Sequence, residues 1–462
     1  MNILGIDLGS TQTCVILTKK NFENDKEELT IIGYGKSKTQ GVKKGAITNI
    51  ELAAKSIQQA VANVQMMSGV QHFDKVVVSI SGAYTRYVES PGLVINPNGG
   101  EIGIKEIQRA VLDAKIKANI PNGYEIIHVL PYNFKVNDID YVEDPLGMSG
   151  KRLEVSTHIV ISQEAHIKNL KKAVELADLK VSNLVLSGYA SAIACLDESE
   201  KELGTILIDM GGAICDIVIH LGNSIRYNEC LQIGSLNITQ DLSIALHTPL
   251  KEAENIKLSY ANLGQEPEKI IQVPSMGDES KVVECNLGSI STVIYSRAEE
   301  TLMLLAKILS ETQLARSAGA GVVLTGGMTK LAGLDKLATA IFDKKAVRIA
   351  SARDNFISSF DEVLKDPEYT CVVGLCLYEA GYFTPYELDS NQRLRCKGEE
   401  MLYNEPIKQE FTPIKEEKNE ILNENSQENH TISVNEKLLE LTPKKEKESP
   451  LLKIWHKIVN QF

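Results

Sequence analysis

The sequence predicts an α/β protein with two lobes and a cleft between them. Short β-rich runs alternate with amphipathic helical stretches up to about Ala380, which is the pattern of α/β lobes. The chain has 462 residues, 43% of them hydrophobic, so it can bury more than one core. Acidic residues also close two apolar strands just before glycine turns, which suggests two related lobes. The clearest strands are Asn2–Asp7, Lys75–Ile80, Thr205–Asp209, Ile214–His220 and Gly321–Thr325.

Composition and charge exclude several function classes. The formal net charge is -12, which argues against a protein that coats nucleic acid, because phosphates are neutralised by a surplus of Lys and Arg. The eight cysteines form no CxxC pair and no spacing that suits zinc or a disulfide framework. We therefore expect reduced packing cysteines and no nucleic-acid partner.

Hydropathy predicts at most a peripheral contact with a membrane. The N-terminal run MNILGIDLGS does not fit a signal peptide, because it lacks a basic start and contains Asp7. No window reaches the roughly 18 apolar residues that spanning a bilayer requires.

The first candidate nucleotide motif follows the N-terminal strand. Asp7 ends that strand, and the turn at Gly9, Ser10 and Thr11 offers backbone amides and hydroxyls to phosphates. Glycine removes a side chain from the point of closest approach, and successive amides form an anion-binding nest. Alone, this motif is weak, because a glycine turn after a strand has a simpler structural explanation.

Two further glycine turns lie in the second half of the chain. Asp209 closes an apolar strand before one of them, and Asp216 lies early in the returning strand. Strand 321–325 precedes the other, where a base and ribose could lie against backbone. The ordered set of three turns favours a nucleotide site over three unrelated turns. The candidate ATP contacts in the turns are Gly9, Ser10, Thr11, Gly211, Gly212, Ala213, Gly326, Gly327 and Met328.

The ordered set resembles the superfamily of sugar kinases, DnaK-type chaperones and actin. This resemblance implies an actin-like two-lobed fold with ATP and Mg²⁺ as cofactors. Asp7 and Asp209 would then hold Mg²⁺ through waters, because this ion keeps much of its hydration shell. Glu254 and Lys257 lie one helical turn apart and can address one ligand. The superfamily makes them adenosine contacts, and from the residues alone a surface ion pair is an equal alternative.

The most specific stretch of the chain is His128–Pro131 followed by Asp144–Glu154, which matches the pattern P-[IL]-G-M-S-G-x-R-L-E. It resembles the FtsA family of bacterial cell division proteins, in which an FtsA-type subdomain replaces the usual actin insertion. Three neighbouring segments agree with the family, namely Gly41–Ile47, Ser79–Gly82 and Gly204–Asp209. The resemblance covers most of residues 1–380 and the terminal helix.

The resemblance divides the chain into eight segments. They are 1–81, the first lobe with the first phosphate motif; 82–160, the inserted subdomain; 161–203, first lobe and interlobe helix; 204–225, second-lobe core with the second phosphate motif; 226–303, the outer subdomain of the second lobe; 304–386, second-lobe core with the adenosine motif and the return to the first lobe; 387–448, a linker; and 449–462, an amphipathic helix. The linker is expected to be disordered and flexible, because Glu, Lys, Asn, Gln and Ser dominate it.

Departures from the family predict slow ATP turnover. The second phosphate loop of the family ends in G-G-G-T, whereas this chain has Ala213 and Ile214, which add a methyl group and remove a hydroxyl beside the phosphates. A hydrolase also needs a group that orients the attacking water. At the interlobe helix, where relatives carry such a group, the chain has Ser187–Tyr189.

The C-terminal residues predict an interfacial helix. Ser449 and Pro450 suit an N-cap and a first turn. One broad apolar stripe follows, made of Leu451, Leu452, Ile454, Trp455, Ile458, Val459 and Phe462. Lys453 and Lys457 lie opposite and can meet anionic lipid. Docking of this helix into a protein groove is the alternative.

The resemblance implies a protein of the division site on the cytoplasmic face of the membrane. It would bind ATP, self-associate into actin-like filaments, anchor FtsZ filaments to the inner membrane and recruit later division proteins. The outer subdomain would bind the C-terminal peptide of FtsZ, and Arg297 stands where the family motif has its arginine. A sugar kinase of the same superfamily and an FtsA-like pilus-assembly docking ATPase are the alternatives.

Overall fold

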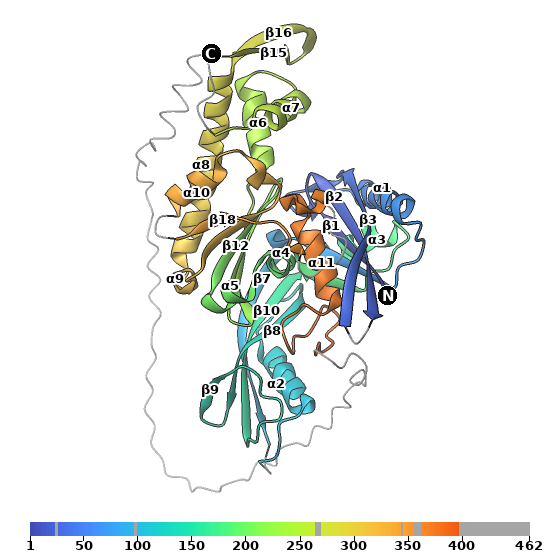
Figure 1. The fold of residues 1–462 in the computed structure, drawn as a ribbon, viewed down its shortest axis with the longest axis vertical. Helices are drawn as coiled ribbons and strands as arrows, with labels where there is room; N and C mark the ends of the chain where they lie inside the picture. The colour runs from blue at the N-terminus through green and yellow to red at the C-terminus, as the bar shows by residue number, and fades with distance from the viewer. Residues whose placement is uncertain (24–25, 97–98, 264–268, 343–344, 355–361, 397–462) are drawn as a thin grey trace, which may run out of the picture. The chain divides into compact units, whose positions relative to one another are not determined.

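The first lobe is built on a five-stranded sheet in the order β11-β6-β1-β2-β3. Figure 1 labels its strands β1, β2 and β3. The structure is a computed structural model that describes residues 1–396 except 24–25, 97–98, 264–268, 343–344 and 355–361. The strands are β1 (Asn2–Leu8), β2 (Gln12–Glu23), β3 (Lys26–Lys38), β6 (Lys75–Ile80) and β11 (Asn183–Leu186). Strands β1, β2 and β3 are antiparallel neighbours, whereas β6 runs parallel to both β1 and β11. A two-stranded ribbon, β4 (Val42–Lys43) and β5 (Ala46–Ile47), follows β3.

Helices cover both faces of this sheet. Helix α1 packs on β3, where a Cβ on Gly35 would lie 2.2 Å from the carbonyl oxygen of Ala60. Helix α11 packs on β1, where a Cβ on Gly5 would lie 2.8 Å from Cys376 Sγ. These glycines let helix and sheet backbones approach closely. The helices of this lobe are α1 (Ile50–Ser68), α3 (Glu164–Glu175), α4 (Ser187–Cys195) and α11 (Thr370–Ala380). Helix α5 (Glu198–Leu203) follows α4 and contacts the second lobe.

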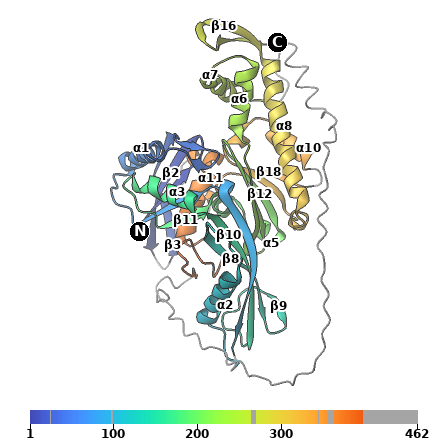
Figure 2. The same cartoon turned by 180° about the vertical axis from the view of Figure 1, so that it is seen from behind.

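The inserted subdomain lies between β6 and α3 and forms a four-stranded sheet of order β7-β10-β8-β9 (Figure 2). Its elements are the 3₁₀ turn η1 (Gly82–Tyr84), β7 (Thr85–Ile95), α2 (Ile104–Lys117), β8 (Tyr124–Val136), β9 (Ile139–Val142) and β10 (Arg152–Gln163). Buried residues of α2 and of this sheet form a separate hydrophobic core. The predicted insertion into an α/β fold is therefore confirmed.

The second lobe has its own five-stranded sheet, in the order β14-β13-β12-β17-β18. Its strands are β12 (Thr205–Met210), β13 (Cys215–Leu221), β14 (Ser224–Leu231), β17 (Gly321–Thr325) and β18 (Val347–Ile349). Strands β12 and β13 form a hairpin that sets Asp209 opposite Asp216. The first-lobe hairpin of β1 and β2 sets Asp7 opposite Cys14 in the same way, so the two lobes repeat one motif.

The outer part of the second lobe contains α6 (Ser235–Ala245), α7 (Leu250–Tyr260), the ribbon of β15 (Ile270–Ser275) and β16 (Asp278–Asn286), and the long helix α8 (Leu287–Glu311). Its predicted limits of 226 and 303 differ from the observed elements. Strand β14 belongs to the lobe sheet through its pairing with β13, and α8 continues past residue 303. The chain then passes through α9 (Leu314–Ser317), η2 (Gly327–Lys330), α10 (Leu334–Ile341), η4 (Glu362–Lys365) and η5 (Pro367–Tyr369) before α11.

The start of the predicted linker is wrong. Residues 384–396, which we call the tail root, pack against the body of the protein, and within them Glu387, Leu388 and Asp389 are buried. Leu388 pairs with Val129 of β8. Tertiary partners thus order a segment whose polar composition predicts flexibility. The rest of the predicted linker and the predicted helix 449–462 lie outside the described residues. Within the described part of the chain, no helix combines the length and apolar character that crossing a membrane requires.

Strand β14 of the second lobe also contacts the inserted subdomain. His158 of β10 is fully buried, and its Nε2 lies 2.8 Å from Asn228 Oδ1 of β14. The guanidinium of Arg226 lies 3.8 Å from the ring centre of Tyr132 on β8. The subdomain is therefore covalently part of the first lobe while it packs on the second.

Acid should weaken this contact through His158. Burial lowers the pKa of His158 to about 4 in the folded protein, whereas the unfolded chain has the ordinary histidine pKa of about 6.5. Between these two values the unfolded chain is protonated at this residue and the folded protein is not. The stability from neutral His158 is complete above pH 6.5 and is lost as the pH falls toward 4. Between pH 7.5 and pH 5 this loss is about 2 kcal/mol. Thermal unfolding of His158→Gln should show a smaller drop over this range than the wild type.

The exposed His72 provides the control for this measurement, because His72→Gln should retain the full pH dependence. Equal drops in the wild type and His158→Gln would contradict the assignment.

Candidate functional site

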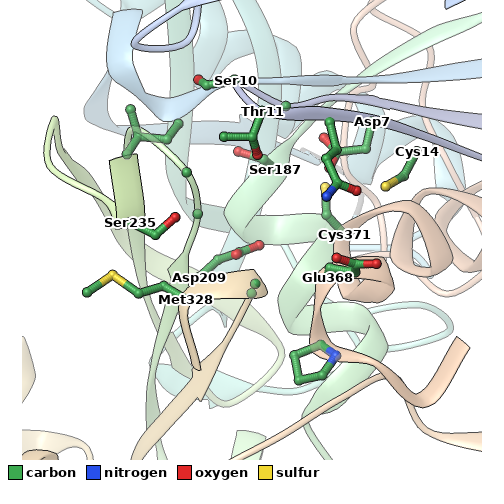
Figure 3. A pocket seen from close by; sticks show the side chains of 18 of the residues that line it. Asp7, Ser10, Thr11, Cys14, Ser187, Asp209, Ser235, Met328, Glu368 and Cys371 are labelled. Atoms are coloured by element: carbon green, nitrogen blue, oxygen red, sulfur yellow. The ribbon is translucent and has the colours of Figure 1, made fainter. Parts of the chain in front are cut away.

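A cavity of about 520 Å³ between the two hairpins contains nearly all the predicted nucleotide contacts (Figure 3). This volume falls within the range of small-molecule and cofactor sites. The predicted residues that line it are Asp7, Gly9, Ser10, Thr11, Asp209, Gly211, Gly212, Glu254, Lys257, Gly326, Gly327 and Met328. Ala213 is buried and does not line the cavity, whereas its neighbour Ile214 does.

The two glycine turns face each other across a gap that admits no further side chain. A Cβ on Gly212 would lie 2.4 Å from Thr11 Cγ2. The carbonyl oxygens of Gly211 and Gly212 accept hydrogen bonds from Ser235 and Leu236 at the start of α6. Since these carbonyls are turned toward α6, the turn is fixed by its backbone, as a phosphate-binding nest requires.

Three aspartates line the cavity: Asp7, Asp209 and Asp216. Burial raises the pKa of Asp7. Burial, together with the charges of the neighbouring carboxylates, raises the pKa of Asp209 to about 7 and that of Asp216 to about 6. A cation would relieve both the repulsion and the lost hydration.

Three serines hold these carboxylates in place. Ser79 Oγ donates to Asp7 Oδ1 at 2.7 Å, and Ser191 Oγ donates to Asp209 Oδ2 at 2.6 Å. Ser187 Oγ donates to Asp216 Oδ2. No group of three or more His, Cys, Asp or Glu side chains in the described residues is close enough to enclose a metal ion by itself. The aspartate oxygens are the kind of ligand that suits Mg²⁺, an ion that takes few protein ligands and completes its shell with water and phosphate.

Glu254 and Lys257 are not an ordinary surface pair. Lys257 is buried, and its Nζ lies 2.8 Å from Glu254 Oε2 and 3.0 Å from Thr239 Oγ1. Both residues of the pair come from α7 and line the cavity. Both side chains line the same cavity as Gly326 and Met328. This geometry is compatible with the predicted role of the pair as adenosine contacts.

Several residues of the cavity were not predicted. Lys36 of β3 donates to Glu368 Oε1 at 2.6 Å, and both side chains line the cavity. Lys330 of η2 lies 2.5 Å from Asp366 and 3.7 Å from Glu368. This ion cluster links β3, the turn η5 and η2 at the cavity rim. No local sequence motif predicts this cluster, because its members come from three distant parts of the chain.

Arg297 lies outside the cavity and already has partners. On α8, its Nε is 2.5 Å and its Nη2 is 3.1 Å from the two carboxylate oxygens of Asp241 on α6, and Nη1 donates to Glu300. This bidentate pair ties α6 to α8.

The fold and the cleft together define a two-lobed actin-like protein with an inserted four-stranded subdomain. The family described as "Cell division protein FtsA" matches residues 206–374, and "SHS2 domain inserted in FTSA" matches residues 82–161. The cell division protein FtsA of Helicobacter pylori (strain ATCC 700392 / 26695) is 38% identical over 423 residues, which are 85% of each chain. That of Pseudomonas aeruginosa is 33% identical over 380 residues, covering 81% of this chain and 88% of its own.

The chain belongs to the FtsA family of cell division proteins. A solved structure titled "PilM-PilN type IV pilus biogenesis complex" has the same fold, with a TM-score of 0.59 at 16% identity over 82% of this chain and 99% of that one. The predicted family and the predicted actin-like fold are both confirmed, and the family membership takes precedence over the sugar-kinase and pilus-assembly alternatives.

Asp209→Asn should separate cation binding from stability. The raised pKa of Asp209 means that its contribution to the stability of the cation-free protein is complete below pH 4 and is lost as the pH rises through about 7. At pH 8 without Mg²⁺, the variant should therefore unfold at a higher temperature than the wild type. Its Mg²⁺-dependent ATP affinity should fall at least about tenfold, a loss of about 1.4 kcal/mol.

Thermal unfolding in EDTA and calorimetric titration with Mg-ATP measure the two effects. Asp138→Asn, on an exposed turn, is the matched control and should change neither. Unchanged Mg-ATP affinity in Asp209→Asn would remove Asp209 from the cation site.

Proposed function

We propose that this protein binds Mg-ATP in the cleft and anchors FtsZ filaments to the cytoplasmic face of the membrane at the division site. The observation that carries the ATP part is the convergence of both glycine turns, the adenosine motif and three carboxylates on one cavity. Membership in the FtsA family supports the role in cell division. Self-association into actin-like filaments and recruitment of later division proteins belong to the same proposal.

ATP acts here mainly as a structural ligand that is hydrolysed slowly. Ser187 of α4 lines the cavity, donates to Asp216 and supplies no amide or carboxylate of its own to orient a water. Ile214 adds an apolar side chain to the cavity wall beside the second turn. Such a site favours binding and lobe closure over turnover.

Residues 449–462 are the proposed tether between the protein and the membrane. Its apolar stripe, which includes Trp455 and Phe462, suits insertion at the boundary of headgroups and acyl chains, and its lysines suit anionic lipid. One helix of this length binds only modestly, so lasting residence at the membrane requires several copies joined in a filament.

Liposome co-sedimentation tests the anchoring function. The full chain should pellet with anionic vesicles and carry a peptide from the FtsZ C-terminus with it, whereas a chain that ends at Glu448 should remain in the supernatant. Trp455→Glu should also abolish pelleting, because a charge at this position opposes insertion into the apolar layer. Asn460→Gln, on the polar side of the predicted helix, is the matched control.

Pelleting of the truncated chain would contradict the tether. Pelleting of the full chain without the peptide would leave the tether standing and contradict the FtsZ contact.

Arg297 is the proposed contact for the FtsZ peptide in the outer part of the second lobe. Its position in the family motif supports this role, and its side chain remains partly exposed. The guanidinium would have to share its bidentate pairing with Asp241 in order to bind an acidic group.

Two variants distinguish a peptide contact from a purely structural tie. Arg297→Ala should weaken peptide binding about tenfold, by the loss of a charge-assisted contact worth about 1.5 kcal/mol. Asp241→Asn should strengthen binding, because it frees the arginine for the peptide. Fluorescence anisotropy with a labelled peptide measures both. If both variants weaken binding equally, Arg297 acts only as a tie between α6 and α8.

A further inference from the structure

Helix α4 contacts the cavity carboxylates with one face and the tail root with another. Ser187 and Ser191 donate to the cavity carboxylates Asp216 and Asp209, and their spacing of four residues sets them on one side of the helix. Tyr189 lies between them in sequence and faces another side. All residues of the helix are buried, so both faces are fully packed.

Tyr189 holds the tail root. Its hydroxyl donates to Glu387 Oε2 at 2.8 Å and accepts from the backbone N–H of Thr384 at 2.7 Å. The other carboxylate oxygen of Glu387 accepts from the hydroxyl of Tyr378 on α11. Glu387 is fully buried, and a buried carboxylate is costly unless such donors satisfy it. The two tyrosines therefore fix where this carboxylate can lie.

Helix α11 also contacts both the cavity and the tail root, but through its two ends. Cys371 in its first turn lines the cavity beside Asp7, and Tyr378 in its last turn holds Glu387. The two helices also touch backbone to backbone, because a Cβ on Gly374 of α11 would lie 1.9 Å from the carbonyl oxygen of Ala190 on α4. Packing this close makes α4 and α11 a single rigid unit. This unit meets the cavity through Ser187, Ser191 and Cys371, and it meets the tail root through Tyr189 and Tyr378.

The tail root also joins other parts of the body. Tyr386 Oη donates to Asp144 Oδ1 of the inserted subdomain at 2.7 Å. Asn183 of β11 donates through its side chain to Asp389 Oδ2 at 3.2 Å. These contacts do not involve α4 or α11, so they provide an internal reference for the contacts that do.

We propose that α4 and α11 couple the occupancy of the cleft to the tail root: bound Mg²⁺ and nucleotide tighten the hold on residues 384–396, and an empty cleft loosens it. The inference rests on the proposed binding of Mg-ATP. A cation would draw Asp7 of the first lobe toward Asp209 and Asp216 of the second lobe. Because Ser187 and Ser191 of α4 hold the latter two, α4 would be fixed between both lobes, and Tyr189 with it. By linkage, breaking the contacts through which α4 and α11 hold the tail root lowers the affinity for nucleotide by the same factor.

Hydrogen exchange of the full chain, with and without the non-hydrolysable analogue AMPPNP and Mg²⁺, tests the coupling. In the wild type, the nucleotide should slow exchange in peptides that cover residues 384–396 about fivefold, the lower end of typical coupling between sites. In Tyr189→Phe, which loses the hydroxyl held by Glu387 and Thr384, this slowing should disappear. Calorimetric titration should show a matching loss of about fivefold in affinity.

Tyr386→Phe is the matched control, because it removes one hydroxyl from the same segment without touching α4. It should keep both the nucleotide-dependent slowing and the affinity. Equal loss in Tyr189→Phe and Tyr386→Phe would overturn the proposal, since the effect would then follow from any weakening of the tail root.

The outcomes separate this inference from the proposed function. If the wild type shows no calorimetric binding of Mg²⁺ with nucleotide, the proposed function fails. If it binds nucleotide and exchange at residues 384–396 does not change, only the coupling fails. Should Tyr189→Phe not fold, Ser191→Ala tests the same connection from the cavity side. It should bind nucleotide with less slowing at the tail root, and full slowing would overturn the coupling.

Discussion

Three aspartates gathered in one cavity impose most of the requirements that the rest of the structure meets. Asp7, Asp209 and Asp216 are brought together by two strand hairpins, one from each lobe, and each is held by a serine hydroxyl. Burial and mutual repulsion make their ionised forms costly, and the raised pKa values are the measure of that cost. Two lobes that meet at such a centre gain stability when a cation enters. The proposed nucleotide site at the junction would therefore also hold the lobes together.

The parts of the site that the sequence predicts are local. A strand that ends in an acidic residue before glycines needs only a few neighbouring residues to be recognised, and for this reason Asp7, Asp209 and Gly326 were found. Ser79, Lys36 and Glu368 were not, because their roles depend on pairing between distant elements. Lys36, for example, meets the cavity only because β3 pairs with β2 so that Lys36 lies opposite Cys14.

At the tail root, the sequence led to a wrong prediction. Its polar residues predict a flexible segment, yet Glu387 and Asp389 are buried because tyrosine hydroxyls and the Asn183 amide satisfy them. Composition measures how much apolar surface a segment can bury, and it is silent on polar partners supplied by other elements. Ala213 illustrates a smaller version of this limit, because its place in the motif suggested the cavity wall and the backbone turns it into the core.

The contact between the inserted subdomain and β14 has a consequence for exchanging parts between relatives. A graft of residues 82–161 from another member of the family would match the first lobe at its two chain ends, where the junctions are covalent. It would still need side chains that fit Arg226 and Asn228 on the second lobe, as Tyr132 and His158 do here. The side chains of the subdomain and of β14 must therefore fit each other, even though the two segments are separate in the chain. A transplanted subdomain should function best when β14 of the same protein is transferred with it.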